Sequence, residues 1–183
     1  MLEAFGIKAA AVAAYMEALE AQAGFARAAG RAAYLLASQE LYGEAEALFR
    51  RALRSDPNNA ATHFNPGFAL DKLGRHADAV VALREATRLR PGLDRAWYGL
   101  GMAQAALGRH AEAAAALHEA ASLQPMNPHA WYALGMAHHT LGDAARVKEV
   151  ALHLVRFDPR MTRRLIRESG TSQLEYLVKD LVV

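Results

Sequence analysis

The feature of this sequence that most constrains its fold is a segment that recurs after 34 residues. Residues 96–103 read AWYGLGMA and residues 130–137 read AWYALGMA. A Leu-Gly pair follows each segment, and each unit closes with a proline. Weaker matches continue the period toward the N-terminus, at Ala33, Ala45, Phe49, Ala52, Pro57, His63, Gly67, Gly74, Ala79, Ala86 and Pro91. Four units at one period indicate a protein built by stacking similar units, each of which contacts its neighbours.

The composition and the spacing of glycine and proline predict that each unit is a helical hairpin. Alanine, the strongest helix former, is abundant and β-branched residues are scarce among the 183 residues. The first helix of a unit would end at a glycine in a left-handed conformation, and the second would end before a proline. Gly101 and Gly135 lack a side chain where a neighbouring helix must come close. Such a hairpin cannot bury its own apolar face, so the units must stack.

The repeat resembles the tetratricopeptide repeat (TPR) family, whose units are 34-residue helix–turn–helix modules. The residues that carry the match are Trp97, Leu100, Gly101, Gly108, Ala113, Ala120 and Pro125. The resemblance implies an all-α fold, a right-handed TPR superhelix with helical caps at both ends. The expected parts are an N-terminal capping helix (a half repeat) at 1–25, four repeats at 26–59, 60–93, 94–127 and 128–161, and C-terminal capping helices at 162–183.

The C-terminal end of the sequence predicts two helices. Residues 160–168 continue the stack as one helix, which Gly170 ends. Ser172 and Glu175 then form a capping-box pattern. Apolar residues follow at helical spacing, namely Leu174, Leu177, Val178 and Leu181. We expect this last helix to cover the open end of the stack.

Two units depart from the pattern. The fourth has Val147 and Leu154 where small residues are expected and Ala151 where a larger one is, so its second helix must pack differently. The second has Pro66 inside its first helix, where proline removes a hydrogen bond and costs about 3 kcal/mol. Either the helix continues through a kink, or Asn65 caps a shorter helix that begins at Pro66. We favour the continuous helix because the flanking register is kept.

The first helices of the units would line the concave surface, and the residues beside the core stripe are the candidate binding residues. Aromatic residues and methionines recur there at the same two places in consecutive units. The candidate groove residues are Arg27, Tyr34, Phe64, Phe68, Arg95, Tyr98, Met102, Tyr132, Met136 and His139. The alternative is that this stripe is core, or that the C-terminal helix covers it. An exposed stripe of this kind is large enough for recognition.

The resemblance narrows the class of ligand. TPR co-chaperones hold the C-terminal carboxylate of heat-shock proteins with a clamp of lysine, asparagine and arginine. Asn65 alone matches this clamp, whereas Gly30, Tyr34 and Gly99 stand where other clamp residues are needed. We therefore expect a groove that binds a peptide segment of a partner protein by apolar anchors, in a chaperone, adaptor or assembly factor. The alternative is a homo-oligomeric scaffold in which the same groove receives a terminal helix of another copy.

Other functions lack their motifs. The chain has no cysteine, and no histidine pair has the spacing of a helical zinc site. No phosphate-binding loop or nucleophile elbow is present, so we expect no enzyme, metal or cofactor. The 21 basic and 19 acidic residues give a net charge of +2, which does not favour nucleic-acid binding. No apolar stretch is long enough for membrane insertion, and we expect a cytoplasmic protein.

One basic group stays open to two interpretations. Four arginines lie close together at Arg160, Arg163, Arg164 and Arg167. They could face an acidic partner or a membrane surface. They could equally be the end of a basic helix, where the macrodipole favours positive charge.

Overall fold

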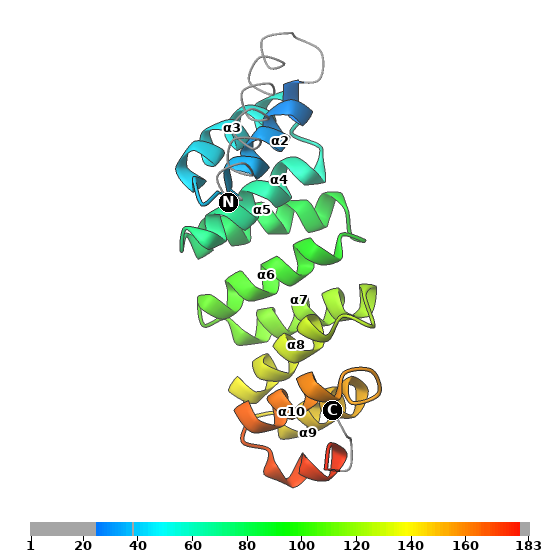
Figure 1. Cartoon of the computed structure of the whole chain (residues 1–183). Coiled ribbons are helices and arrows are strands. Elements are labelled where there is room, and N and C mark those ends of the chain that lie inside the picture. Colours follow the sequence, from blue (N-terminus) through cyan, green and yellow to red (C-terminus); the bar gives the residue numbers. More distant parts are fainter. Residues whose placement is uncertain (1–24, 38, 180–183) are drawn as a thin grey trace, which may run out of the picture. The chain divides into compact units, whose positions relative to one another are not determined.

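The structure, a computed structural model, describes residues 25–37 and 39–179 (Figure 1). The described residues form nine α-helices and one 3-10 helix, with no strand among them, which confirms the predicted all-α fold. The capping helix expected at 1–25 lies, except for Phe25, outside the described residues. Two compact units divide the chain, Met1–Pro91 and Gly92–Val183, and each is described by itself.

Each unit is a series of helices in which neighbours along the chain pack together. The first unit contains α2 (Phe25–Ala37), α3 (Tyr42–Ser55), α4 (Ala60–Lys72) and α5 (His76–Leu89). The second contains α6 (Asp94–Ala106), α7 (His110–Leu123), α8 (Pro128–Thr140), α9 (Ala144–Leu154), α10 (Pro159–Glu168) and the 3-10 helix η1 (Ser172–Leu177). The helices α4, α6 and α8 begin at residues 60, 94 and 128. The sequence period therefore sets the start of each of these helices.

Left-handed residues end the first helix of each pair, as predicted. Gly74, Gly108 and Gly142 have φ angles of 74°, 73° and 74°. The corresponding residue of the first pair, 34 positions before Gly74, is Glu40. Its φ is 64°, the one positive value of a non-glycine residue in the described part of the chain. A side chain in this conformation costs about 1–2 kcal/mol, so the first turn carries strain that the other three avoid.

Glu40→Gly is expected to raise the free energy of unfolding by about 0.5–1 kcal/mol, because glycine adopts the left-handed turn without a Cβ clash. The measurement is urea unfolding followed by circular dichroism. Gly108→Ala is the reciprocal control and should destabilise by a similar amount. A loss of stability in Glu40→Gly would contradict the strain.

Close approach explains the glycines inside the first helices. A Cβ added to Gly67 would lie 2.6 Å from Cγ of Leu83, and one added to Gly101 would lie 2.6 Å from Cγ of Leu117. Real Cβ atoms do not come this close to a neighbour. The predicted contact of Gly101 with a neighbouring helix is therefore confirmed, and the partner is the large residue 16 positions later in the chain.

The fourth pair makes this contact with a different helix. Sixteen positions after Gly135 lies Ala151, which is too small to reach it. Leu165 of α10 takes the place instead, and its two Cδ atoms would each lie 2.8 Å from a Cβ added to Gly135. Leu165 is fully buried. The small side chain of Ala151, where the two preceding units carry leucine, thus leaves room for α10.

The helix α4 runs without interruption from Ala60 to Lys72, with Pro66 inside it. The predicted continuous helix is confirmed, and the alternative N-cap at Asn65 is wrong. Asn59 is the cap, since its side chain accepts a hydrogen bond from the amide of Ala61 (3.0 Å). The Thr62 hydroxyl adds a bond to the Asn59 carbonyl (2.6 Å), so the first turn is fixed before Pro66 is reached.

The predicted helix 160–168 is present as α10, and Asp158 caps it by accepting a hydrogen bond from the amide of Met161 (2.8 Å). The capping box of Ser172 and Glu175 is wrong, because η1 is a short 3-10 helix without a side-chain cap. The amide of Thr171 donates to the carbonyl of Ile166 (3.1 Å). This bond closes the C-terminal turn of α10, and η1 begins directly afterwards at Ser172, with Thr171 at its N-cap.

Candidate binding surface

The second unit places two Tyr-Met pairs at the same positions of α6 and α8. Tyr98 and Met102 lie one turn apart on α6, and Tyr132 and Met136 lie one turn apart on α8. Both tyrosines and Met136 pack against one core cluster while staying partly accessible, and Met102 is 40% exposed. We call these four residues the Tyr/Met surface. Its side chains are neither fully core nor fully exposed.

A network of polar contacts borders this surface at α10. The hydroxyl of Tyr132 donates a hydrogen bond to the carboxylate of Glu168. The guanidinium of Arg164 lies 4.6 Å from the centre of the Tyr132 ring, and its Nε donates to Glu168 (2.9 Å). The hydrogen bond from Tyr132, together with that from Arg164, lowers the pKa of Glu168. Burial, followed by the bond to Glu168, raises the pKa of Tyr132. These contacts tie α10 to α8.

Arg164 and Glu168 were not among the predicted site residues. Both lie on α10, which packs against α8 and lies almost wholly beyond the fourth repeat. A search at the repeat period therefore misses them.

Two further predicted residues flank the Tyr/Met surface. Arg95 precedes Tyr98 by three positions on α6, and His139 follows Met136 by three positions on α8. Both side chains are exposed. Either can therefore meet a ligand that contacts the neighbouring tyrosine or methionine.

The remaining predicted residues belong to the first unit. Phe68 of α4 is 44% exposed, Phe64 is half-buried, and the ammonium of Lys72 lies 5.5 Å from the centre of the Phe68 ring. Arg27 and Tyr34 lie on α2, but their side chains are outside the described residues. The structure thus brings the predicted residues of the second unit together on α6 and α8.

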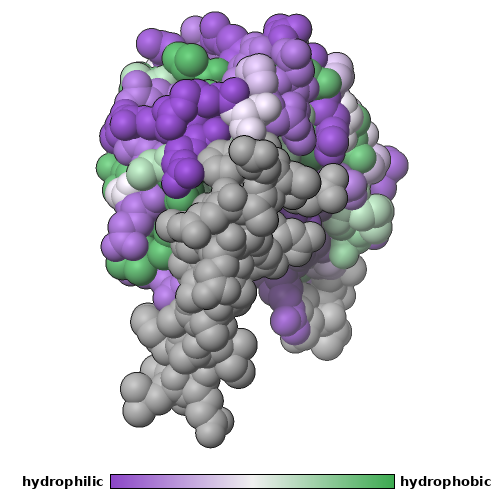
Figure 2. All heavy atoms as spheres, turned by 90° about the horizontal axis from the view of Figure 1, so that it is seen from above, coloured by the Kyte–Doolittle hydropathy of each residue, from purple (hydrophilic) through white to green (hydrophobic). Residues whose placement is uncertain are grey.

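Exposed apolar side chains are otherwise scattered. Figure 2 shows mostly hydrophilic residues where described atoms are visible, with hydrophobic residues in small patches. Examples are Val81 on α5, Met126 in the loop between α7 and α8, and Tyr176 on η1. Single exposed apolar residues are ordinary. The repeated placement of the Tyr/Met surface, rather than its exposure alone, makes it the candidate.

Sequence comparison decides the family. Three tetratricopeptide repeat profiles match the chain, at residues 6–60, 70–137 and 128–160. The chain belongs to the tetratricopeptide repeat family. TPR modules mediate protein–protein interactions. No curated protein sequence matches the chain.

Solved TPR structures share this fold. The chain is similar to YrrB, described as a TPR protein with an unusual peptide-binding site, with a TM-score of 0.76 and 24% identity over 93% of this chain and 87% of that one. It is also similar to PilF of Pseudomonas aeruginosa (TM-score 0.75, 21% identity, 96% and 86% of the chains). MamA of Desulfovibrio magneticus gives a TM-score of 0.72 and 21% identity over 88% and 86%.

Two buried polar residues, Gln104 and His138, occupy the same position of consecutive TPR units. Leu36 and Leu70 are buried near the ends of α2 and α4, and Gln104 and His138 occupy the corresponding places of α6 and α8. Neither Oε1 of Gln104 nor Nδ1 of His138 has a hydrogen-bond partner among residues 25–37 and 39–179. Burial, with a smaller contribution from the charge of Arg146, lowers the pKa of His138. The last two TPR units therefore carry polar groups where leucine packs in the first two.

The stability of the chain is expected to fall as the pH drops below about 6.5, because unfolded His138 binds a proton more readily than the folded, buried side chain does. Well above pH 6.5 His138 is neutral in both states and does not lower the free energy of unfolding. Stability is lost progressively as the pH falls from 6.5 toward the lower pKa of the folded state. His138→Leu should raise the melting temperature and reduce its difference between pH 7.5 and 5.5.

Gln104→Leu is the matched control, since it replaces the other buried polar side chain but titrates no group. It should raise the melting temperature equally at both pH values. An unchanged pH dependence in His138→Leu would assign the effect to other groups.

Two further observations concern other kinds of site. None of the described helices is long and apolar enough to cross a membrane. In the part of the chain that the structure describes, no three histidine or carboxylate side chains come together as metal ligands would.

Proposed function

We infer that this TPR chain is an interaction module that binds a peptide or helical segment of a partner protein on the Tyr/Met surface. The observation that carries this proposal is the repeated Tyr-Met pair on α6 and α8. Tyrosine offers contact area with a polar end, and methionine adapts its shape to a ligand. Because both tyrosines rest on the core cluster, a ligand would meet anchors that are already ordered.

Polar residues at the border would select among partners. Arg95 and His139 lie beside the anchors and can bind carboxylates or carbonyl oxygens of the segment. Phe64 and Phe68 would serve as anchors in the first unit, and Arg27 and Tyr34 of α2 stay further candidates there. The peptide-binding site named for YrrB belongs to a chain of the same fold and supports this class of function. We propose a non-catalytic chaperone, adaptor or assembly factor of the cytoplasm.

The test compares a methionine on the Tyr/Met surface with an exposed methionine elsewhere in the same unit. Met102 is 40% exposed on the Tyr/Met surface, and Met126 is 69% exposed between α7 and α8. Peptides are first selected from a random phage-displayed library on the wild-type protein, and their affinities are then measured by fluorescence anisotropy. Met102→Glu should weaken binding about tenfold or more, because it places a charge among the apolar anchors. Met126→Glu should leave the affinity unchanged.

Tyr98→Ala with its control Tyr176→Ala repeats the comparison for the tyrosines. Equal affinities for wild type, Met102→Glu and Tyr98→Ala would overturn the proposal. Light scattering on the same samples tests the scaffold alternative, in which the groove receives another copy. A wild-type oligomer that Met102→Glu dissociates, together with no peptide that depends on Met102, would favour the scaffold.

A further inference from the structure

A cleft lies at the C-terminal end of the second unit, between α10 and η1. Its volume is about 630 Å³. The residues that line it are Arg163, Ile166, Arg167, Gly170, Ser172, Glu175, Val178 and Lys179. The guanidinium of Arg167 also lies 3.8 Å from the carboxylate of Glu168, which borders the Tyr/Met surface. The cleft therefore adjoins that surface, but none of the four residues of the Tyr/Met surface lines it.

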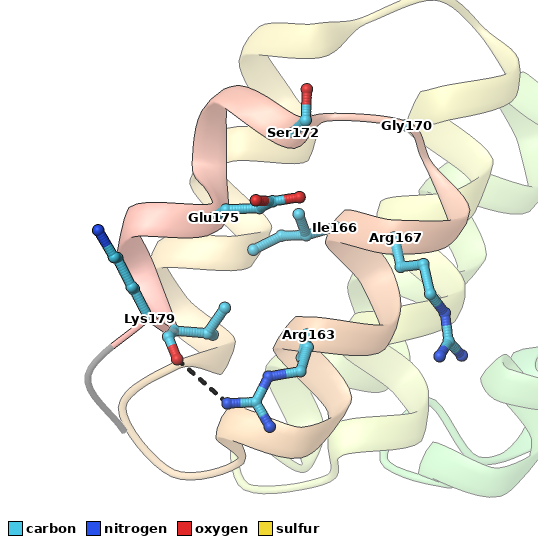
Figure 3. Close-up of a pocket in the computed structure, with 8 residues that line it drawn as sticks. Arg163, Ile166, Arg167, Gly170, Ser172, Glu175 and Lys179 are labelled. Carbon is cyan, nitrogen blue, oxygen red and sulfur yellow. Dashed lines mark hydrogen bonds between the residues drawn. The ribbon is translucent and has the colours of Figure 1, made fainter. Parts of the chain in front are cut away.

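The floor of the cleft is apolar and its ends are basic. Ile166 and Val178 line the floor with 3% and 5% of their surfaces exposed, so a ligand meets only the outer edges of these two side chains. Figure 3 shows Arg167 and Lys179 at opposite ends of the cleft, with Glu175 pointing from η1 toward Ile166. Among the described lining residues, three are cationic and Glu175 alone is anionic. The charge of the cleft thus favours an acidic ligand.

The walls are held in place by contacts across the cleft. Arg163 donates a hydrogen bond to the carbonyl of Val178 (3.1 Å), drawn as the dashed line in Figure 3. The amide of Thr171 donates to the carbonyl of Ile166 (3.1 Å) on the other side. These two bonds join α10 to the chain before and after η1. The apolar floor is therefore formed before any ligand arrives.

We propose that the C-terminal cleft binds an acidic peptide segment that carries an apolar side chain. The apolar side chain packs on Ile166 and Val178, and carboxylates on either side of it meet Arg167 and Lys179. Glu175 repels a carboxylate at the centre, so the apolar residue occupies that position. Arginine suits this task because its planar guanidinium matches a carboxylate.

The probe is a short fluorescein-labelled peptide in which two glutamates flank one leucine on each side, titrated with the full chain at low ionic strength. Binding should saturate and weaken with added salt. The double variant Arg167→Glu/Lys179→Glu should bind about tenfold more weakly. The matched control Arg54→Glu/Arg84→Glu changes the net charge equally on exposed residues of the first unit and should bind as wild type.

Two probe peptides check the chemistry of the site. Replacing the glutamates by lysine should abolish binding, and replacing the leucine by serine should weaken it. Circular dichroism confirms that the double variant is folded. The proposal is overturned by absence of saturable binding, by an equal loss in the control variant, or by a loss in Met102→Glu that the cleft variant does not show. The last result would place the acidic peptide on the Tyr/Met surface instead.

Discussion

Leu165→Ala is expected to lower the free energy of unfolding by about 3 kcal/mol, within the range for fully buried leucines. Leu165 is completely buried and packs where α10 meets Gly135. Its removal leaves a cavity between α8 and α10. In the two preceding units a leucine of the same unit fills this place, but the corresponding residue here is Ala151, which is too small to do so. The measurement is urea unfolding followed by circular dichroism.

Two further variants make this test specific. Leu152→Ala truncates a leucine that is 38% exposed on α9, and it should cost well under 1 kcal/mol. Ala151→Leu restores the residue type found at Leu83 and Leu117, and it should recover part of the loss in the Leu165→Ala background. In the wild-type background the same change should be destabilising, since Leu165 already occupies the space. Equal costs for Leu165→Ala and Leu152→Ala would contradict the packing described.

Gly101→Ala is expected to destabilise the chain by about 1–2 kcal/mol, although alanine is the better helix former by about 1 kcal/mol. The added methyl group would lie 2.6 Å from Cγ of Leu117 and 3.1 Å from the carbonyl oxygen of Ala113. Leu117 is buried and cannot move into solvent. The measurement is again urea unfolding.

The control for this prediction is a glycine-to-alanine change that should raise the free energy of unfolding instead of lowering it. Gly30 lies within α2, and a Cβ added there would meet nothing within 4 Å among residues 25–37 and 39–179. Gly30→Ala should therefore stabilise by up to about 1 kcal/mol. Combining Gly101→Ala with Leu117→Ala should cost less than the sum of the two single changes, because the new methyl group enters the cavity. An increase in stability for Gly101→Ala alone would show that α6 and α7 separate easily.

Positions that the repeat period fixes could be predicted from the sequence. Gly74, Gly108 and Gly142 recur at one spacing, and each has the left-handed conformation that ends a helix. Gly101 is predictable for the same reason, since a residue without a side chain recurs where two helices meet. The continuity of α4 through Pro66 followed from the kept register of its neighbours.

Positions outside the period could not be predicted in this way. The capping box at Ser172 is a local pattern, and it fails because η1 begins at Ser172 itself, with Thr171 at the N-cap and no side-chain cap. Arg164 and Glu168 were missed because they lie on α10, beyond the fourth repeat, where the period offers no position for comparison. The groove residues of the second unit are grouped in space, whereas their role in binding stays a prediction.

The contact of Leu165 with Gly135 has a consequence for how such a gene can lengthen. Gly67 and Leu83 lie within one repeat, as do Gly101 and Leu117, so a copied 34-residue stretch carries both partners. In the last pair they lie on either side of residue 159. A tandem duplication that inserts a repeat before residue 128 preserves every contact of this kind, whereas one that inserts it between α9 and α10 separates Leu165 from Gly135. We therefore expect a repeat inserted inside the chain to keep this packing, and one inserted between α9 and α10 to destabilise the C-terminal end.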